Sequence, residues 1–347
     1  MSAKNPKHSK VKIEEQTITF GKTHINRLRR IDVLLTKQFS YLFDPYPLIS
    51  PVVVDIGYGD SPITTLEMAN AIHSQNKEVE VVGCEIDGKR VRFAKSFVEN
   101  LVSSATMAST QQQFSRVNTN KMNFYQCGFE FLSHVSKKKN EEKSQQKVVL
   151  IRCMNVLRQF YDESNVKNIH QTLCQQLCDN GILCEGTSNK FGSYWCVNLL
   201  NSRCQCVAIV FGCNLKRDKG LKTDHFHPKN WQPFLPKNLI HRVNNEKGDD
   251  TIIYDFFTEW RQSYEEMKFS LHIYGNIRQH FIQTIQHFSS KTQTFKVERK
   301  LSLVKRGFIE LMSKKSPDFT SICKIKCNII DYPSKRQFPI EIIIVIN

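Results

Sequence analysis

Short apolar runs alternate with segments of helical periodicity in the first half of the chain. Residues 52–56 form an apolar run that ends in glycines, which is typical of a buried parallel strand. Apolar side chains then recur at helical spacing over residues 64–75, and a second apolar run covers residues 79–86. This order of strand, turn, helix and strand predicts the βαβ unit of a doubly wound sheet.

The same alternation continues to about residue 186, after which the pattern becomes antiparallel in character. We therefore predict an α/β protein with a Rossmann-like, doubly wound, mostly parallel seven-stranded sheet. Helices are expected on both faces of this sheet, together with an N-terminal helix and a C-terminal extension. The further elements expected are helices over 25–39, 89–101, 163–178, 255–268 and 277–288, and strands at 124–125, 148–153, 182–185 and 207–212.

Composition divides the chain into three segments. Residues 1–20 are polar and Lys-rich, and we expect a disordered basic tail there. Residues 21–289 hold the α/β domain, with insertions near 103–120, rich in Ser, Thr and Gln, and near 136–147, rich in charge. Residues 290–347 form a basic C-terminal extension, and the sequence leaves open whether it is a small subdomain or an added strand region.

Positive charge is concentrated at the two ends of the chain. The net charge is +16, and residues 1–50 hold nine Lys and Arg against four Asp and Glu. Residues 290–347 hold twelve against five, so the middle of the chain is nearly balanced. Basic ends allow nucleic-acid binding, because Lys and Arg neutralise phosphates. Solvated tails are the equally good alternative.

Several classes of protein are disfavoured by the sequence. The twelve cysteines include no CxxC pair and no Cys/His cluster at zinc-finger spacing, so no metal site is expected. The first residues, MSAKNPKHSK, lack the apolar core of a signal peptide. No apolar run approaches the roughly 20 residues that cross a bilayer. We expect a cytoplasmic protein without a membrane partner; a nuclear location and the oligomeric state stay open.

The segment VVVDIGYGDSP, residues 52–62, is the most informative part of the chain. Asp55 lies near the end of the predicted strand, and Gly57, Tyr58 and Gly59 follow it. Glycines at this point let the backbone turn sharply and approach a ligand closely. Ligands of open α/β sheets bind at the carboxyl ends of the strands. The alternative is a tight strand-to-helix turn with nothing bound.

A second acidic position strengthens the prediction of a nucleoside site. Glu85 ends the next predicted strand, where an acid can accept hydrogen bonds from both ribose hydroxyls. Asp87 can share this task, and either acid can instead favour a helix N-terminus. A dinucleotide fingerprint requires GxGxxG, whereas this loop reads GYGDSP. The acids would also repel a diphosphate but tolerate a cationic cofactor.

Together these motifs resemble motif I and the following motif of class I S-adenosylmethionine-dependent methyltransferases. The stretches 127–130, 151–160, 180–187 and 235–242 resemble an uncharacterised bacterial branch of that superfamily, and the resemblance spans roughly residues 22 to 285. Ser61 replaces a glycine that is common in motif I. The resemblance implies cofactor-binding roles for Asp55, Gly57, Tyr58, Gly59, Glu85, Asp87, Gly128, Phe129 and Asn155. Among these, Glu85 would take the ribose hydroxyls, Gly128 and Phe129 the adenine ring, and Asn155 the side facing the substrate.

The resemblance implies a methyltransferase with S-adenosyl-L-methionine as cofactor and an unidentified methyl acceptor. The alternative is a catalytically inactive module that binds RNA or a protein through its basic ends. No catalytic residue is assigned. Candidate bases are Glu185, His225, His227 and His241, and candidate anion-binding residues are Arg152, Arg158 and Arg242; a structural or surface role is the alternative for each.

Overall fold

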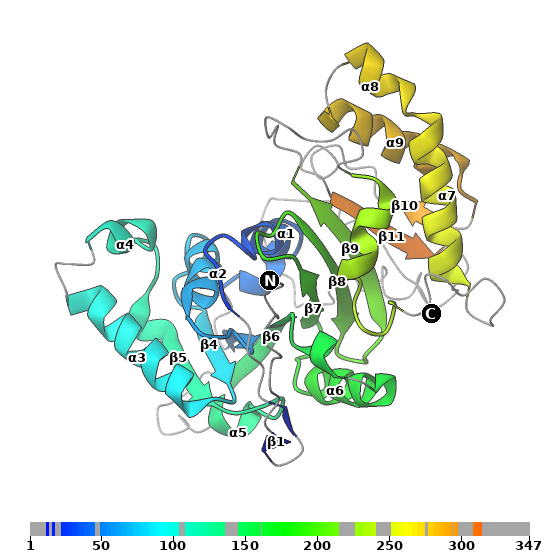
Figure 1. The fold of residues 1–347 in the computed structure, drawn as a ribbon. Helices are drawn as coiled ribbons and strands as arrows, with labels where there is room; N and C mark the ends of the chain where they lie inside the picture. Colours follow the sequence, from blue (N-terminus) through cyan, green and yellow to red (C-terminus); the bar gives the residue numbers. More distant parts are fainter. Residues whose placement is uncertain are drawn as a thin grey trace, which may run out of the picture.

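A single nine-stranded sheet organises the described part of the chain (Figure 1). The strand order is β10-β11-β9-β8-β7-β6-β3-β4-β5. Apart from two paired two-residue strands, Lys12–Ile13 and Gln16–Thr17, the N-terminal segment 1–20 lies outside the described residues. The computed structural model describes residues 12–13, 16–17, 22–45, 49–103, 108–135, 145–160, 162–214, 226–240, 251–274, 277–293, 295–297 and 308–313.

Five parallel strands form the half of the sheet that carries the sequence motifs. They lie in the order β5-β4-β3-β6-β7, and neighbouring pairs are parallel throughout. The order reverses between β3 and β6, which is the position where doubly wound sheets bind ligands beyond the strand ends. Their bounds are β3 Ile49–Ile56, β4 Glu80–Glu85, β5 Met122–Gln126, β6 Gln145–Met154 and β7 Ile182–Ser188.

Four antiparallel strands complete the sheet. β8 (Tyr194–Asn201) and β9 (Cys206–Cys213) follow β7 as a meander and bring the sheet to the predicted seven strands. β11 (Phe308–Ser313) then pairs with β9, and β10 (Phe295–Val297) pairs with β11. The described parts of the C-terminal extension therefore belong to the main sheet. The sequence analysis did not predict β8, whose central residues are buried on both faces.

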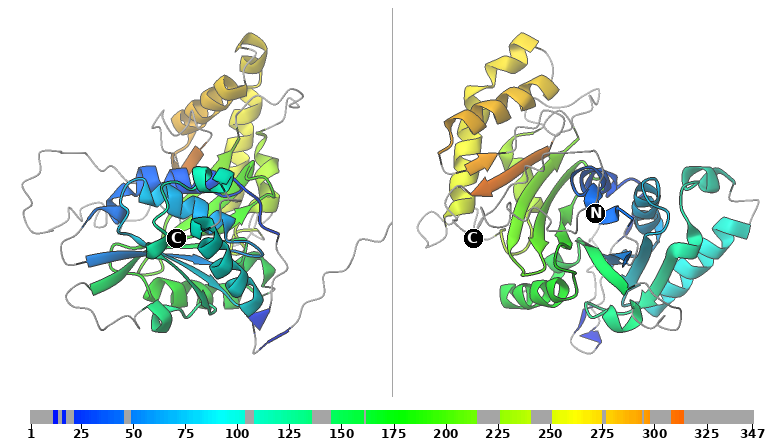
Figure 2. Two further views of the ribbon diagram at one scale, coloured as in Figure 1. Left: turned by 90° about the vertical axis from the view of Figure 1, so that its left-hand side faces the viewer. Right: turned by 180° about the vertical axis from the view of Figure 1, so that it is seen from behind.

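Helices cover both faces of the sheet, as predicted (Figure 2). On one face α1, α2 and α3 bury apolar side chains against β3, β4 and β6. The other face is covered by α5 and α6, and further along by α7 and α9 over β8 and β9. The bounds are α1 Arg29–Gln38, α2 Ile63–His73, α3 Gly88–Ser103, α4 Ala108–Gln113, α5 Leu132–Val135, α6 Glu163–Gln175, α7 Ile252–Glu266, α8 Phe269–Tyr274 and α9 Ile277–Lys291.

The amphipathic spacing of apolar residues explains how these helices pack against the sheet. In α3 the buried residues Val91, Ala94, Val98 and Leu101 recur every three or four positions and form one apolar stripe. α4 lies within the predicted insertion at 103–120, which is therefore partly helical. Most of the predicted insertion at 136–147 lies outside the described residues. Short 3-10 segments are Ser40–Phe43, Thr119–Lys121, Leu157–Gln159 and Pro228–Phe234.

The predicted N-terminal helix begins later than its apolar spacing suggests. α1 starts at Arg29 rather than near residue 25, and Asn26 has a φ of 61°, in the left-handed region. A residue in that conformation ends helical geometry, so residues 22–28 run as an irregular segment before α1. In the part of the chain that the structure covers, no helix combines the length and apolar character needed to cross a bilayer.

Candidate functional site

The loop after β3 has the backbone conformation that its glycines predict. Gly57 and Gly59 have φ values of 68° and 90°, which a residue with a Cβ adopts only at a cost in free energy. The Gly57 N–H donates to the Cys84 carbonyl oxygen at 2.7 Å, so the loop is tied to the end of β4. A Cβ on Gly57 would lie 2.6 Å from Cγ2 of Val156. This glycine is therefore required by packing as well as by conformation.

Tyr58 contributes its backbone to the site, whereas its side chain points into the core. The side chain is 4% exposed, and its ring meets the Phe124 ring edge-on at 5.5 Å between centroids. Burial, reinforced by the nearby Glu85 carboxylate, raises the pKa of the Tyr58 hydroxyl. The implied role in cofactor binding is thus confined to backbone atoms.

Glu85 lies at the tip of β4 and holds the glycine loop. Its Oε2 accepts a hydrogen bond from the Gly59 N–H at 3.0 Å, and its Oε1 accepts from the Ile86 N–H at 3.0 Å. Burial raises the pKa of this carboxyl, while Arg90, with Nη1 3.6 Å from Oε2, counteracts the rise. The acid and the glycine loop are therefore in contact.

The other predicted residues on this side of the sheet lie around the tip of β4. The Asp87 Oδ1 accepts from the Lys89 N–H at 2.8 Å, as expected for an acid at the start of α3. Gly128 and Phe129 follow β5 and reach the same region, because the Cys127 N–H donates to the Glu85 carbonyl oxygen at 3.1 Å. Phe129 is partly buried, and its ring lies 5.8 Å from that of Phe160.

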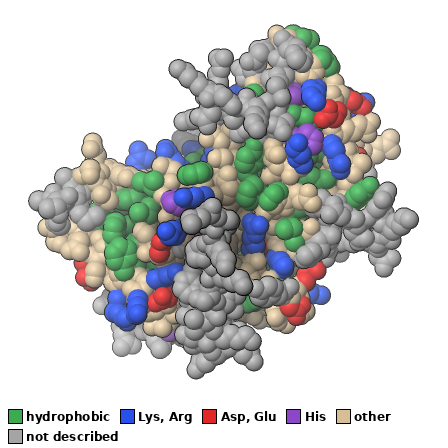
Figure 3. All heavy atoms as spheres, viewed as in Figure 1, with side chains coloured by type: hydrophobic (Ala, Val, Ile, Leu, Met, Phe, Trp, Pro, Cys, Tyr) green, Lys and Arg blue, Asp and Glu red, His purple; other side chains and the backbone are tan. Residues whose placement is uncertain are grey.

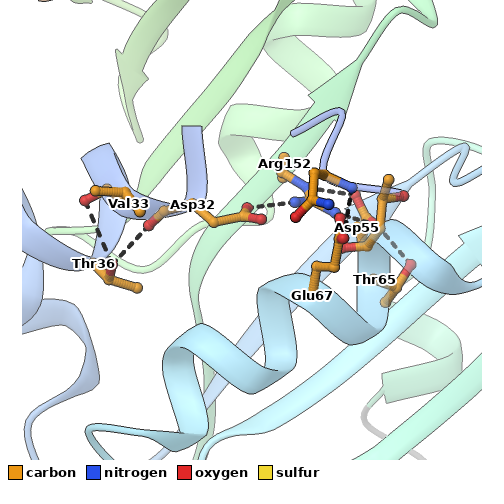
Figure 4. Close-up of polar contacts among 9 residues, drawn as sticks. Asp32, Val33, Thr36, Asp55, Thr65, Glu67 and Arg152 are labelled. Atoms are coloured by element: carbon orange, nitrogen blue, oxygen red, sulfur yellow. Dashed lines mark hydrogen bonds and ion pairs between the residues drawn. The ribbon is translucent and has the colours of Figure 1, made fainter. Parts of the chain in front are cut away.

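Asp55 lines the hollow beside the glycine loop, but its carboxylate is occupied by protein groups (Figure 4). Arg152 donates from Nε to Oδ1 at 2.9 Å and from Nη2 to Oδ2 at 2.7 Å. Thr65 donates its hydroxyl to Oδ2 at 2.7 Å. The opposite end of the guanidinium binds Asp32 of α1, and Nη2 also donates to the Thr64 carbonyl oxygen at 2.9 Å.

The cluster of Asp32, Asp55 and Arg152 is a buried ion triad. Arg152 is 0% exposed, and its guanidinium binds Asp32 and Asp55 within the core. The prediction that it binds an anionic substrate is therefore wrong. Burial disfavours its charge, but Asp32 and Asp55 outweigh this effect and raise its pKa. Burial also raises the pKa of Asp32 to about 6, against the opposing effect of Arg152. The triad joins α1, α2, β3 and β6 beneath the site.

Residues 22–28, which the sequence analysis did not assign to the site, form a strap over the glycine loop. Thr23 donates its hydroxyl to the Tyr58 carbonyl oxygen and its N–H to Asp60 Oδ1, both at 2.7 Å. The Asn26 N–H donates to Glu67 Oε1 of α2 at 2.6 Å. No local motif marks such a segment, since its contacts are made to residues 35 or more positions away.

Arg27 anchors the other end of the strap to the end of β7. Its Nη2 donates to the Ser188 carbonyl oxygen, and its Nε donates to the Ser188 hydroxyl and the Asn189 carbonyl oxygen, all at 3.2 Å. Its Nη1 donates to the Lys22 carbonyl oxygen at 3.2 Å. Every acceptor is neutral, and burial lowers the pKa of Arg27. The strap therefore places at the site a partly buried cation that pairs with no carboxylate of the described residues.

A hollow lies between the strap, the glycine loop and the end of β6. Its empty volume, including space open to solvent, is about 490 Å³. Asn155 lines it in the left-handed conformation, with a φ of 64°, and its amide exchanges hydrogen bonds with Ser188 at 2.8 and 3.2 Å. Glu85, Gly128 and Phe129 lie outside its lining. The lining residues are Lys22, Thr23, Arg27, Leu28, Asp55, Ile56, Gly57, Tyr58, Gly59, Thr64, Met154, Asn155, Val156 and Gln159.

The two candidate bases that the structure describes, Glu185 and His227, do not line this hollow. Glu185 is 1% exposed on the sheet face covered by α6, where its Oε2 lies 3.4 Å from His170 Nε2 and accepts from Asn198 at 3.2 Å. His227 accepts from the Lys229 N–H at 3.2 Å at the start of the 3-10 segment Pro228–Phe234. Arg158 is exposed. His225, His241 and Arg242 lie outside the described residues.

Comparison with known proteins identifies no family. No family model matches the chain, and no curated protein matches it in sequence. Among solved structures, the plantazolicin methyltransferases BamL and BpumL, both in complex with SAH, have TM-scores of 0.29 and 0.28 at 17% and 15% identity. Each alignment covers 46% of this chain, which spans 45% and 48% of theirs. A DUF574 family protein from Streptomyces avermitilis has a TM-score of 0.29 at 14% identity, with 46% and 51% of the two chains covered. These similarities are too low to argue from.

Proposed function

We propose that the protein is an S-adenosylmethionine-dependent methyltransferase. The sequence motifs do not identify its methyl acceptor. One observation carries the proposal. The Gly57–Gly59 loop lies at the carboxyl end of β3, where the strand order reverses, and Glu85 at the tip of β4 touches it. Doubly wound sheets bind nucleoside cofactors at this place. A glycine loop beside an acid suits a cofactor that has a ribose diol and lacks phosphates.

The position and charge of the hollow fit the methionine end of such a cofactor. It lies directly beside the glycine loop, at the carboxyl end of β3. Arg27 lines one side and would face the carboxylate of the methionine portion. Asp55 would add a negative potential near the ammonium group, although the triad uses its hydrogen-bonding capacity. The ribose and adenine would extend toward Glu85 and Phe129.

When bound, S-adenosylmethionine supplies a methyl carbon already activated by a sulfonium. The protein then has to position the acceptor and exclude water. The strap closes one wall of the hollow through Thr23, and Asn155 fixes the end of β6 against β7. These contacts support a rigid site in which binding geometry, rather than a dedicated acid, does most of the work.

Isothermal titration calorimetry with S-adenosylmethionine tests the proposal. Glu85→Gln should lower the affinity roughly 10- to 100-fold, because hydrogen bonds to a charged acceptor contribute about 1.5–3 kcal/mol. Glu80→Gln is the matched control: Glu80 starts the same strand at its other end, is also buried, and binds Asn123 and Gln146. Absence of measurable binding by the unaltered protein would contradict the proposal.

A binding module that keeps the fold without transferring methyl groups is the competing function. One observation favours it: the carboxylates of Asp55 and Glu85 already have protein partners, so the fold accounts for both acids without a cofactor. RNA or protein binding through the basic ends is the form of this alternative that the charge distribution suggests. It predicts no calorimetric signal with S-adenosylmethionine. It also predicts partner affinity that falls steeply with salt and is lost when the Lys and Arg residues of segments 1–20 and 314–347 are replaced by Gln, which leaves β10 and β11 in place.

A further inference from the structure

The turn between β7 and β8 lies at the edge of the hollow. Arg27, which lines the hollow, donates to the Asn189 carbonyl oxygen at 3.2 Å. Two hydrogen bonds close the turn internally. Asn189 Oδ1 accepts from the Ser193 N–H at 2.8 Å, and the Asn189 N–H donates to the Tyr194 carbonyl oxygen at 2.9 Å. Residues 189–193 are therefore an ordered part of the site and have a defined position relative to the strap.

This ordered turn presents an aromatic ring to solvent. Phe191 is 72% exposed, the highest value among the large hydrophobic side chains of the described residues. Lys190 Nζ lies 5.5 Å from the centroid of its ring, and the His24 ring of the strap lies 6.4 Å away. Ile25, beside His24, is 50% exposed. We call Lys22, His24, Lys190 and Phe191 the rim platform; it combines a flat apolar face with positive charge.

The lysines of the rim platform have no carboxylate partner among the described residues. No ion pair joins Lys22 or Lys190 to a carboxylate there. In the proposed site Arg27 faces the carboxylate of the methionine portion, so S-adenosylmethionine leaves both lysines available to a second anion. Lys and Arg side chains are spread over both sides of the molecular face in Figure 3, interspersed with Asp and Glu. Positive charge at the rim therefore favours an acceptor that carries negative charge.

We infer that the rim platform binds the methyl acceptor and that this acceptor contains a nucleotide unit, a base stacked on Phe191 with its phosphate beside Lys22 and Lys190. A planar base matches the exposed ring, and a phosphate matches Lys190, whose Nζ lies 5.5 Å from that ring, and Lys22 on the neighbouring strap. An acidic peptide supplies the charge but no base for the ring. The inference rests on the proposed function, since it names the acceptor of that site. The nucleotide unit can belong to a single-stranded RNA or be a free nucleotide.

Fluorescence anisotropy with a fluorescein-labelled oligouridylate of about ten nucleotides tests the inference. The full-length protein is saturated with S-adenosylhomocysteine, so that the probe does not compete for the adenosine site. Phe191→Ala should weaken binding roughly tenfold, the expected loss of one stacked base. Lys190→Ala should weaken it and lower its salt dependence. Phe269→Ala, which removes a 55% exposed phenylalanine on α8, is the matched control and should change nothing.

Competition with unlabelled molecules identifies the source of the nucleotide. Displacement by oligouridylate but not by uridine 5′-monophosphate indicates a nucleic acid, and displacement by both at similar phosphate concentration indicates a free nucleotide. Equal affinities of the Phe191→Ala and unaltered proteins would overturn the inference. Polyphosphate or poly-glutamate competing as well as oligouridylate would also overturn it, because charge alone would then explain binding. Calorimetry with S-adenosylmethionine on the same preparation reports separately on the proposed function.

Discussion

Arg152 and Asp55 are 97 positions apart in the sequence and form a two-point ion pair beneath the candidate site. The guanidinium Nε and Nη2 lie 2.9 and 2.7 Å from the two carboxylate oxygens, and neither residue is more than 2% exposed. Burying a charge without a partner costs several kcal/mol in folding free energy, and each of these two residues offsets that cost for the other. Because the pair joins β6 to β3 where the strand order reverses, it supports the floor of the hollow.

Replacing Arg152 should unfold the protein more easily. Arg152→Met leaves Asp32 and Asp55 buried without their cation, and we expect a loss of about 3–5 kcal/mol in the free energy of unfolding. Urea denaturation followed by circular dichroism measures this loss. The exposed Arg158→Met is the control and should change stability by less than about 0.5 kcal/mol. If the Arg152 variant is insoluble, Arg152→Lys should show a smaller loss; equal stability of all three chains would contradict the prediction.

Gly57 should tolerate alanine poorly, and Val156 should account for part of the cost. Gly57→Ala places a Cβ 2.6 Å from Val156 Cγ2 on a backbone with a φ of 68°, so we expect a loss of about 2 kcal/mol or more in unfolding free energy. Val156→Ala removes the clash but leaves the backbone strain. In a double-mutant cycle the combined variant should therefore lose less stability than the sum of the two single changes. Strict additivity would show that the clash relaxes elsewhere.

Glu67 should make stability depend on pH. Burial raises its folded-state pKa to about 7, although the Asn26 N–H, Arg152 and Arg29 oppose the rise. The folded protein thus keeps this proton where the unfolded chain has lost it, and between about pH 4.5 and 7 stability falls as pH rises. Glu67→Gln still accepts from Asn26 and should be about 1–2 kcal/mol more stable than the unaltered protein at pH 8. At pH 4 the two should be equal. Urea denaturation between pH 4 and 8 measures the difference in unfolding free energy between the two proteins, and titratable groups that they share cancel from it. A difference that does not change with pH would contradict the raised pKa of Glu67.

The strap should contribute to cofactor affinity more than to stability. Thr23→Val removes the hydrogen bond from its hydroxyl to the Tyr58 carbonyl oxygen, and we expect S-adenosylmethionine to bind about two- to tenfold more weakly. Calorimetry measures the affinity, and thermal unfolding checks that the fold is intact. Ser74→Ala, which removes an exposed hydroxyl bond to the Ala71 carbonyl oxygen, is the control. Equal affinities of the Thr23 and Ser74 variants would mean that the strap does not close the site.

Local pattern was sufficient for the parallel half of the fold and for the central motif. The apolar runs at 52–56 and 79–86 and the periodic segment between them lie in β3, β4 and α2, because strand and helix periodicities are properties of consecutive residues. The sharp turn at the glycines after β3 was also predictable, since such a turn requires the positive φ that glycine adopts. The sequence also placed Glu85 at the end of the second strand, and the structure adds its hydrogen bond to the Gly59 N–H.

Contacts between residues far apart in the sequence were decided by the tertiary structure. Arg152 looked like a surface or substrate residue, and only burial beside Asp32 and Asp55 made it part of the core. The direction of the Tyr58 side chain, the strap at 22–28 and the addition of β11 to β9 likewise depend on contacts distant in sequence. The physical reason is desolvation: a charged or polar group takes its role from whichever partners surround it once water is removed, and local pattern does not specify those partners.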